Sequence, residues 1–176
     1  RADVTTRAGL LPGAPYRRRA TEDALRAVSE RLRARQYYEA AVTHVATDRG
    51  ADVVDVTVTL DAGPLVEIVV DGDPLPPEGG LDDWIPIRRE NSADADLLED
   101  SAFRIRQAWQ REGYWRADVT PRSDLSPDGS RMVVTFTIAR GLRYRLAAIA
   151  VQGTRHFDER DVLALTGLRT GIPFVE

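Results

Sequence analysis

Acidic side chains come closest to a pattern that could perform chemistry in this chain. Asp82 and Asp83 are adjacent, and Asp94, Asp96, Glu99 and Asp100 form a second group. Two carboxylates in one pocket act as general acid and base when their environments separate their pKa values. Negative charge is also stabilised at the first turn of a helix, and this is the simpler interpretation of the second group. A carboxylate-dependent enzyme stays an alternative hypothesis.

Other residue types form no catalytic or metal-binding pattern. His44 and His156 lie far apart, neither belongs to an HExxH sequence, and the chain has no Cys. Ser29, Ser101 and Ser126 stand outside any G-x-S-x-G context. The Gly-rich segments lack the Lys that phosphate-binding loops require. We therefore expect no catalytic residue, no metal, no cofactor and no small-molecule substrate.

Composition places the chain among soluble globular proteins. It has 176 residues, of which 43% are hydrophobic and 30% charged, so it can bury a core without being disordered. The net charge of −4 argues against a nucleic-acid partner. No apolar run approaches the ~18 residues of a membrane span. Residue 1 is Arg and no signal peptide is present, so we expect an excised piece or a processed product.

The elements that would position any site are repeated along the chain. RLRARQYYEAAV at 31–42 matches AWQREGYWRADV at 108–119, which sets Tyr37 and Tyr114 77 residues apart. VTVTLDAG at 56–63 matches VTFTIARG at 134–141, and AGLLPGAPY at 8–16 matches TGLRTGIPF at 166–174. A fixed period of this size indicates one structural unit used more than once.

The middle copy shows one unit from strand to strand. Its β-branched run at 65–72 predicts a strand, and 81–90 is either a short helix or an irregular packed segment. Leu98, Ala102, Ile105 and Trp109 lie on one face of a helix predicted at 94–112, which Gly113 ends. A strand over 114–124, a turn at 126–129 and an alternating strand at 132–138 complete the unit.

The outer copies supply parts of the same unit. In the first, a helix capped by Thr21 and lined by Ala24, Leu25, Val28 and Leu32 precedes a strand at 40–47, a turn at 48–50 and a strand at 54–60. In the third, a strand over 144–151 precedes a helix over 158–165 that ends at Gly167. Amphipathic helices beside short strands favour a two-layer domain.

This order resembles polypeptide-transport-associated (POTRA) domains. One part of the resemblance is a long helix followed by Gly113-Tyr114 and a hairpin, although Gln36 replaces the glycine in the first copy. The other part is carried by Gly141, Tyr144, Leu146, Ile149, Val151, Gly153, His156-Phe157 and Gly171-Ile172-Pro173-Phe174. The resemblance implies an α+β fold of tandem βααββ repeats, each a three-stranded mixed sheet covered on one face by two helices. We expect a partial domain at 1–62, a complete one at 63–140 and a partial one at 141–176.

The resemblance also implies a location and partners. POTRA domains precede outer-membrane β-barrels in barrel-assembly factors, the translocation-and-assembly module and two-partner secretion transporters, and occur singly in divisome proteins; tandem copies favour the barrel-linked group. We expect a periplasmic scaffold, part of a Gram-negative outer-membrane protein whose C-terminal β-barrel is absent from this fragment. The implied partners are unfolded outer-membrane or secreted polypeptides and assembly-complex proteins.

The resemblance implies that the first strand of each hairpin lies at a sheet edge. Pro121 agrees with this, because Pro is tolerated in edge strands. An edge offers unpaired N–H and C=O groups to an extended polypeptide, which is β-augmentation. The candidate edge residues are Ala40, Val42, His44, Ala46, Ala117, Val119 and Pro121. Pro121 removes one donor, so the first-copy edge is the better acceptor, and an edge that binds nothing is the alternative.

Aromatic side chains at the helix-to-strand corner give a second candidate surface. We expect Trp109 in the core and Tyr37 and Tyr114 packed at the corner. Tyr38 and Trp115 are candidate partner contacts, with packing against an adjacent domain as the alternative.

Several hypotheses stay open from the sequence. The chain is the POTRA region of an assembly factor, that of a two-partner secretion transporter with one substrate, or a structural spacer. The half-units at its two ends also permit head-to-tail complementation between chains.

Overall fold

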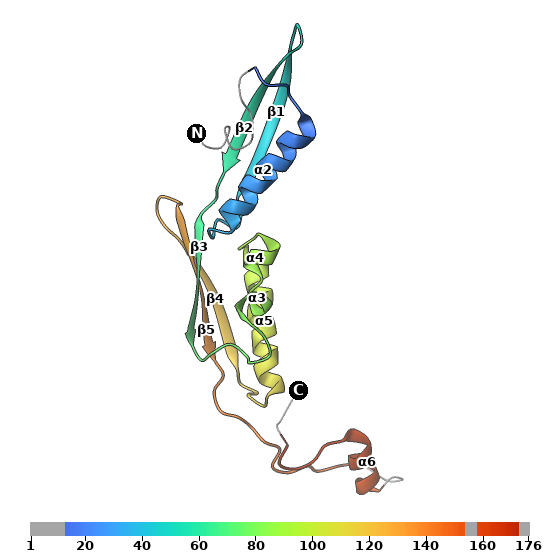
Figure 1. The fold of residues 1–176 in the computed structure, drawn as a ribbon. Helices are drawn as coiled ribbons and strands as arrows, with labels where there is room; N and C mark the ends of the chain where they lie inside the picture. Colours follow the sequence, from blue (N-terminus) through green and yellow to red (C-terminus); the bar gives the residue numbers. More distant parts are fainter. Residues whose placement is uncertain (1–12, 154–157, 173–176) are drawn as a thin grey trace. The chain divides into compact units, whose positions relative to one another are not determined.

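The computed structural model describes residues 13–153 and 158–172. Helices and strands follow one another as shown in Figure 1. The elements are α2 (Arg18–Arg33), β1 (Ala41–Gly50), β2 (Val53–Asp61), β3 (Leu65–Gly72), α3 (Leu81–Trp84), α4 (Ile87–Glu90), α5 (Ala95–Arg111), β4 (Asp118–Leu125), β5 (Arg131–Ala139) and α6 (Glu159–Thr166).

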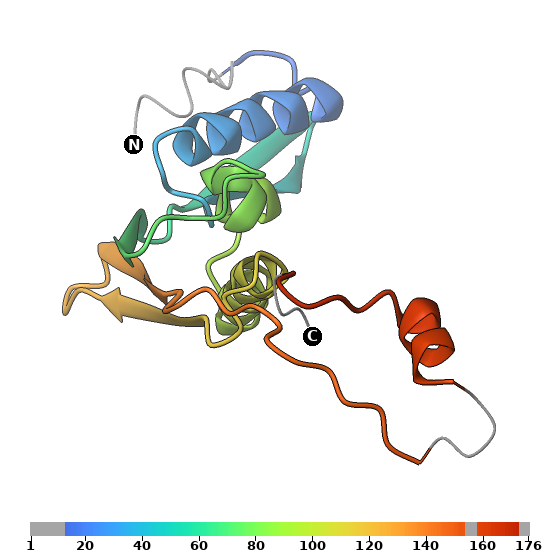
Figure 2. The same cartoon turned by 90° about the horizontal axis from the view of Figure 1, so that it is seen from below.

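The first sheet is an antiparallel hairpin of β1 and β2. Its register pairs Val42 with Leu60 and His44 with Val58, so these four side chains share one face. Helix α2 lies along the hairpin in both views and contacts β1 (Figures 1 and 2). The strand predicted at 54–60 is confirmed as β2, although only Val56 and Val58 are half-buried, whereas Val54 and Leu60 are exposed.

Two local predictions for the first copy were wrong. Thr21 does not cap α2, because Arg17 is the N-cap and the Thr21 amide donates to the Arg17 carbonyl in the first helical turn. The hairpin turn is not at 48–50 but at Ala51 and Asp52, which both have positive φ. A two-residue turn of this kind matches the twist of the paired strands, which favours it over a turn centred on Gly50.

The second sheet has three strands in the order β3-β5-β4. Backbone bonds join Leu65 to Ser130 at one end of β3 and Asp73 to Ile138 at the other, so β3 and β5 run parallel. Strands β4 and β5 form an antiparallel hairpin, closed where the Ser126 amide donates to the Arg131 carbonyl. The sheet is mixed, as the α+β prediction required.

The core of this sheet lies between its inner face and α5, which lies beside it in Figure 1. The α5 face predicted from sequence is buried, with Ile105 fully so. Val134, Phe136 and Ile138 alternate along β5 and are also buried. Burying one such large apolar side chain stabilises the fold by about 2 kcal/mol.

The helical part of the second copy begins in pieces. The ambiguous segment forms the single turns α3 and α4, which stand in the place of the first predicted helix. Asn91, with φ of 53°, ends α4. The Asp94 carboxylate then accepts a hydrogen bond from the Leu97 amide at 2.8 Å and starts α5. The arrangement is therefore βααββ-like, with two short turns as its first helical element.

The helix-to-strand corner repeats in backbone detail. The Tyr37 amide donates to Leu32 at 3.2 Å, and the Tyr114 amide donates to Trp109 at 3.1 Å. Just before each tyrosine, the chain adopts positive φ, 70° at Gln36 and 92° at Gly113. The predicted strand over 114–124 therefore starts late, at Asp118, because the corner occupies the residues before it.

The same corner residue meets the start of the next copy. The Gln36 carbonyl accepts from the Val66 amide at 2.9 Å, and the Gly113 carbonyl accepts from the Tyr144 amide at 2.7 Å. Val66 and Tyr144 are equivalent in the sequence repeat. The period found in the sequence is thus reproduced by two pairs of matching hydrogen bonds.

The third copy has its helix but not its strand. Helix α6 begins at the N-cap Asp158, and Gly167 ends it with φ of 67°, as predicted. The strand predicted over 144–151 was wrong: Arg145 forms an isolated bridge, and Leu146 bonds with Gly171 and Ile172. A strand requires a continuous neighbour, and among the described residues none runs beside this segment.

The chain forms two compact units. Among the described residues, one takes in those up to 69, 86–97 and 122–134, and the other takes in 70–85, 98–121 and 135 onward. Strands β3, β4 and β5 each contribute residues to both. The domain boundaries at 62/63 and 140/141 stay a prediction.

Replacing Gln36 with Gly should stabilise the protein. A non-glycine residue in the left-handed region costs about 1 kcal/mol, and the bond to Val66 uses the backbone, so it survives the change. We expect a higher urea midpoint for Gln36→Gly and a lower one for Gly113→Ala, the matched change at the equivalent corner. An unchanged or lower midpoint for Gln36→Gly would contradict the assignment of strain to this residue.

The β4–β5 turn should lose a stabilising charge in acid. Hydrogen bonds from Ser126 and then Ser130 lower the pKa of Asp128 from 3.8 to about 2. A depressed carboxyl pKa stabilises the fold above pH 3.8, and this contribution disappears as the pH falls through about 2. An NMR titration followed at the Ser130 amide should show a midpoint near 2, and Ser126→Ala should raise it. A wild-type midpoint near 3.8 would contradict the assignment.

Candidate functional site

Strands β1 and β4 both lie at sheet edges. Strand β4 ends the order β3-β5-β4, and β2 is the one partner of β1 among the described residues. Each is the first strand of its hairpin, so the predicted edge position is confirmed for both. Their free sides can pair with an added strand.

The candidate edge residues divide by position. Val42, His44 and Ala46 lie within β1, and Val119 and Pro121 lie within β4. Ala40 and Ala117 lie before these strands and are buried in the corner, with amides that donate to Tyr37 and Tyr114. The two alanines thus belong to the corner, whereas the other five lie on the edge strands.

The two edges differ in their backbone donors. Pro121 has no N–H to donate. Strand β4 therefore retains its hydrogen bonds to β5 only if the backbone of Pro121 faces away from β5. Successive residues face opposite sides, so Val119 and Ser123 also present their backbone groups to the free side of β4. The equivalent residues of β1 are Val42, His44 and Ala46 (119, 121 and 123 less 77), each of which has an N–H. Strand β1 thus has an uninterrupted row where β4 has a gap.

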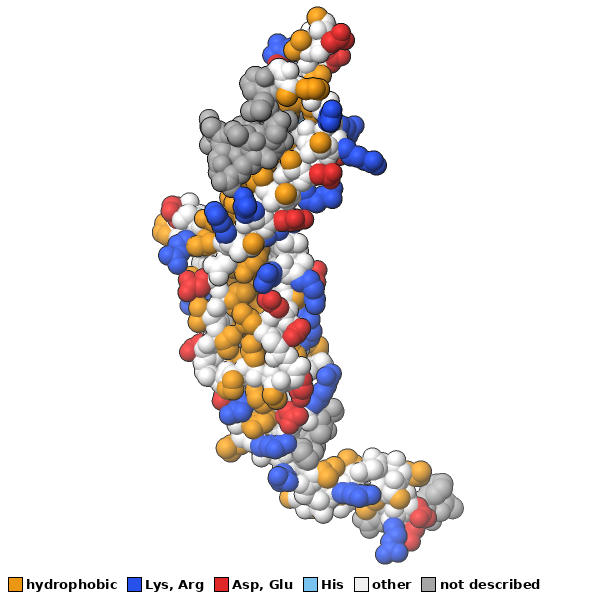
Figure 3. Space-filling model, viewed as in Figure 1, with side chains coloured by type: hydrophobic (Ala, Val, Ile, Leu, Met, Phe, Trp, Pro, Cys, Tyr) orange, Lys and Arg blue, Asp and Glu red, His pale blue; other side chains and the backbone are white. Residues whose placement is uncertain are grey.

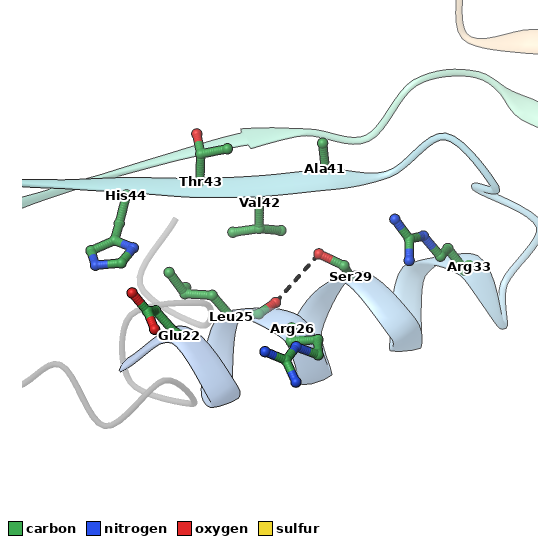
Figure 4. A pocket seen from close by; sticks show the side chains of 9 residues that line it. All are labelled: Glu22, Leu25, Arg26, Ser29, Arg33, Ala41, Val42, Thr43 and His44. Atoms are coloured by element: carbon green, nitrogen blue, oxygen red, sulfur yellow. Dashed lines mark hydrogen bonds between the residues drawn. The ribbon is translucent and has the colours of Figure 1, made fainter. Parts of the chain in front are cut away.

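A groove runs between α2 and β1, on the side of β1 away from β2. Figure 4 shows it from close by. Its volume is about 340 Å³, and none of its lining residues comes from β2. The lining residues are Glu22, Leu25, Arg26, Ser29, Arg33, Ala41, Val42, Thr43 and His44. A strand added to β1 would therefore place alternate side chains at this groove.

The groove has an apolar middle. Val42 and His44 point toward the helix in Figure 4, whereas Ala41 and Thr43 point away. Leu25 faces Val42 and is 2% exposed. Ser29 is a small residue on the same helix face, and its hydroxyl donates to the Leu25 carbonyl at 3.4 Å. These residues form a floor that accepts small or apolar side chains.

Polar groups lie at the two ends of the groove. At one end, Tyr16 and His44 share a hydrogen bond of 3.1 Å, and Glu22 pairs with Arg18 at 3.0 Å. At the other end, Arg33 donates from Nη2 to the Ala40 carbonyl at 3.2 Å. Arginines also project along the outer side of α2 in Figure 3.

The sequence analysis missed the polar side of this groove. It placed α2 by its apolar residues, considered Ser29 only as a catalytic serine, and left out Glu22, Arg26 and Arg33. These four follow one another at spacings of four, three and four residues, which places them along one side of the helix. That spacing was the available signal, and it indicates a polar stripe along this side of α2.

The aromatic residues of the corner are placed as predicted, with one exception. Trp109 is buried, and Tyr114 packs edge-on against it with ring centroids 5.3 Å apart. Trp115 is 37% exposed and packs edge-on against Tyr144, as the domain-packing alternative requires. Tyr38 is only 9% exposed, so little of it is available to a partner. A partner role for Trp115 stays a prediction.

The carboxylates considered for catalysis serve local structure. Asp83 accepts from the Gly80 amide at 2.8 Å, and Asp94 accepts from Ser92 Oγ at 2.6 Å as well as from Leu97. These bonds, that of Ser92 first, lower the pKa of Asp94, and a general acid needs the opposite shift. Asp94, Asp96, Glu99 and Asp100 are exposed. In the described part of the chain, no group of three metal-ligating side chains occurs, and His156 lies outside it.

Comparisons with known proteins identify the first repeat. Residues 2–63 match the sequence model of the POTRA family, described as surface antigen variable number repeat. No curated protein matches the chain. No helix in the described ranges is long and apolar enough to span a membrane.

Solved structures similar to the chain include three of BamA or Omp85. Haemophilus influenzae BamA POTRA3-5 has a TM-score of 0.44 and 14% identity, over 99% of this chain and 74% of that one. The N-terminal domain of Omp85 from Thermosynechococcus elongatus has a TM-score of 0.35 and 19% identity, over 99% and 73%. POTRA1-2 of the periplasmic domain of Omp85 from Anabaena has a TM-score of 0.30 and 20% identity, over 81% and 87%.

The family match and the repeated backbone describe the same unit. Residues 2–63 match the family directly, and the segment from α5 to β5 repeats the helix, corner and hairpin of that region with equivalent hydrogen bonds. Residues 2–63 are therefore similar in sequence to the POTRA family, and the second repeat shares the backbone pattern of that region.

Proposed function

We propose that this chain is a non-enzymatic periplasmic module that binds extended polypeptides by β-augmentation at β1. The observation that carries the proposal is the free edge of β1 beside a groove of about 340 Å³. Main-chain bonds to such an edge hold a strand without demanding a particular sequence, and the groove receives its alternate side chains. This combination suits a protein that handles many unfolded chains.

Strand β4 is the weaker acceptor of the two edges. Pro121 interrupts its row of donors in the middle, which is one of the devices that protects a sheet edge from unwanted pairing. The two repeats thus divide their roles, with β1 binding polypeptide and β4 closed to it.

The family match of residues 2–63 supports a biological setting, because POTRA domains adjoin outer-membrane β-barrels. We propose that this chain belongs to the periplasmic part of a Gram-negative outer-membrane protein and aligns outer-membrane or secreted polypeptides, with assembly-complex proteins as further partners. A two-partner secretion transporter is the second candidate, and the β1 edge serves either one.

Proline at the centre of β1 should weaken the proposed binding. His44→Pro removes the N–H that Pro121 lacks in β4, so the added strand loses a central backbone bond. We expect binding of a fluorescent peptide of alternating Val and Thr to weaken about fivefold, measured by fluorescence anisotropy, since one bond is worth roughly 1 kcal/mol.

Two further variants control this experiment. His44→Ala retains the N–H and should bind nearly as the wild type does, which separates the backbone from the imidazole. Pro121→His should give β4 its missing donor and raise the binding stoichiometry. Circular dichroism verifies that each variant folds. Equal affinity of wild type and a folded His44→Pro variant would overturn the proposal and favour a structural spacer.

A further inference from the structure

We infer that the α2–β1 groove selects extended segments carrying an Asp or Glu side chain, which Arg33 binds. The inference rests on the proposed function, because it concerns the same edge and names the chemistry of its ligand. It makes Arg33 the specificity-determining residue of the groove. The three observations that carry it are an unsatisfied guanidinium, the charge balance of the groove and the contrast with the second repeat.

The guanidinium of Arg33 is held but not satisfied. Its Nη2 donates to the Ala40 carbonyl, which fixes the side chain at the start of β1. Its Nε is buried and has no hydrogen-bond partner. Buried donors are nearly always paired, and a charged one left alone is costly, so this atom calls for an acceptor. Arg33 lines the groove, so a ligand carboxylate there meets its guanidinium, and the enclosed Nε becomes accessible to that carboxylate when the side chain turns.

The remaining charges of the groove leave this positive charge uncompensated. Glu22, its one carboxylate, lies toward the opposite end and is paired with Arg18. Arg26 also lines the groove and adds positive charge, with Asp23 at 3.9 Å as its nearest acidic partner. In the described part of the chain, no carboxylate lies within ion-pair distance of Arg33. A carboxylate is the group whose geometry fits the planar guanidinium.

The rest of the groove specifies the neighbours of this carboxylate. Alternate residues of an added strand point the same way, so those on the groove side meet Arg33 and then the floor formed by Ser29, Leu25 and Val42. Small or apolar side chains fit that floor. The predicted ligand is therefore an alternating segment with one acidic residue near the Arg33 end.

The second repeat lacks this chemistry although it shares the corner. Gln110 is the equivalent of Arg33, and its amide donates to the Trp115 carbonyl at 3.3 Å. Arg106, a long side chain, replaces the small Ser29. In the second repeat, the position equivalent to Arg33 thus carries a neutral side chain that already has a hydrogen-bond partner. This is also the repeat in which Pro121 interrupts the edge.

The test uses the whole chain and peptides of alternating Val and Thr. Each peptide has amidated and acetylated ends, and a single Glu is moved through the positions of one face, with the Gln series as its neutral counterpart. Amidation removes the terminal carboxylate as a competing source of charge. We expect one Glu position to bind about tenfold more tightly than its Gln counterpart, as a charge-assisted hydrogen bond predicts.

Charge reversal then assigns the effect to one residue. Arg33→Glu should abolish the preference for Glu and favour Lys at the same position. Arg31→Glu is the matched control, because it changes the same charge two residues away on α2 at an exposed position outside the groove lining. Arg33→Lys retains the charge and loses the planar fork, so part of the preference should survive. Circular dichroism verifies folding, and Arg33→Lys provides the test if Arg33→Glu fails to fold.

The outcomes separate this inference from the proposed function. If no peptide of either series binds, the proposed function fails. If Glu and Gln peptides bind equally to the wild type, the edge binds polypeptide but Arg33 does not select it, and the inference is overturned. The same holds if Arg31→Glu abolishes the preference as fully as Arg33→Glu, because the effect is then one of net charge.

Discussion

The left-handed residue that ends the long helix is the constraint on which each repeat depends. At Gln36 and at Gly113, positive φ turns the chain out of the helix and aims a carbonyl at the opening segment of the next copy. One backbone conformation therefore ends the helix, starts the hairpin and receives the neighbouring segment. In the first copy this left-handed conformation costs free energy, because Gln36 has a side chain. In the second copy Gly113 adopts it without a steric penalty.

On this shared backbone, the two repeats differ in what their edges can do. The corner fixes where β1 and β4 begin, so the exposed sides of both strands carry equivalent residues. Differences on these strands and on the preceding helices then change the chemistry without changing the fold: His44 against Pro121 on the strands, and Arg33 against Gln110 and Ser29 against Arg106 on the helices. Function in a repeat protein is thus decided by side chains at a few equivalent positions, and the fold alone does not reveal it.

How much the sequence predicted depended on the range of the interactions involved. The strand at 65–72, the face of α5 and the glycine ends of α5 and α6 followed from local pattern and are confirmed. The strand at 144–151 was wrong, because alternation shows that a segment can be a strand and not that a partner lies beside it. The turn at Ala51-Asp52 was missed because Ala51 is not typical of a turn whose two residues both have positive φ. The groove was missed because it lies between polar residues of α2 and strand β1. The sequence alone does not show which β1 residues face that helix.

An edge that binds by main-chain bonds alone has a problem of register. A strand can slip along such an edge, and a slip of one residue exchanges the side chains on its two faces. The backbone cannot prevent this, because its hydrogen bonds look alike after the slip. A single charged anchor at one end of the groove can prevent it, since only one alignment brings a carboxylate to the Arg33 guanidinium, which has no acidic partner among the described residues. Arg33 bonds to the chain just before β1 begins, so the distance along the edge between its guanidinium and the backbone donors of β1 is fixed. Broad acceptance of sequences and a defined alignment are then compatible, because the first comes from the backbone and the second from one side chain.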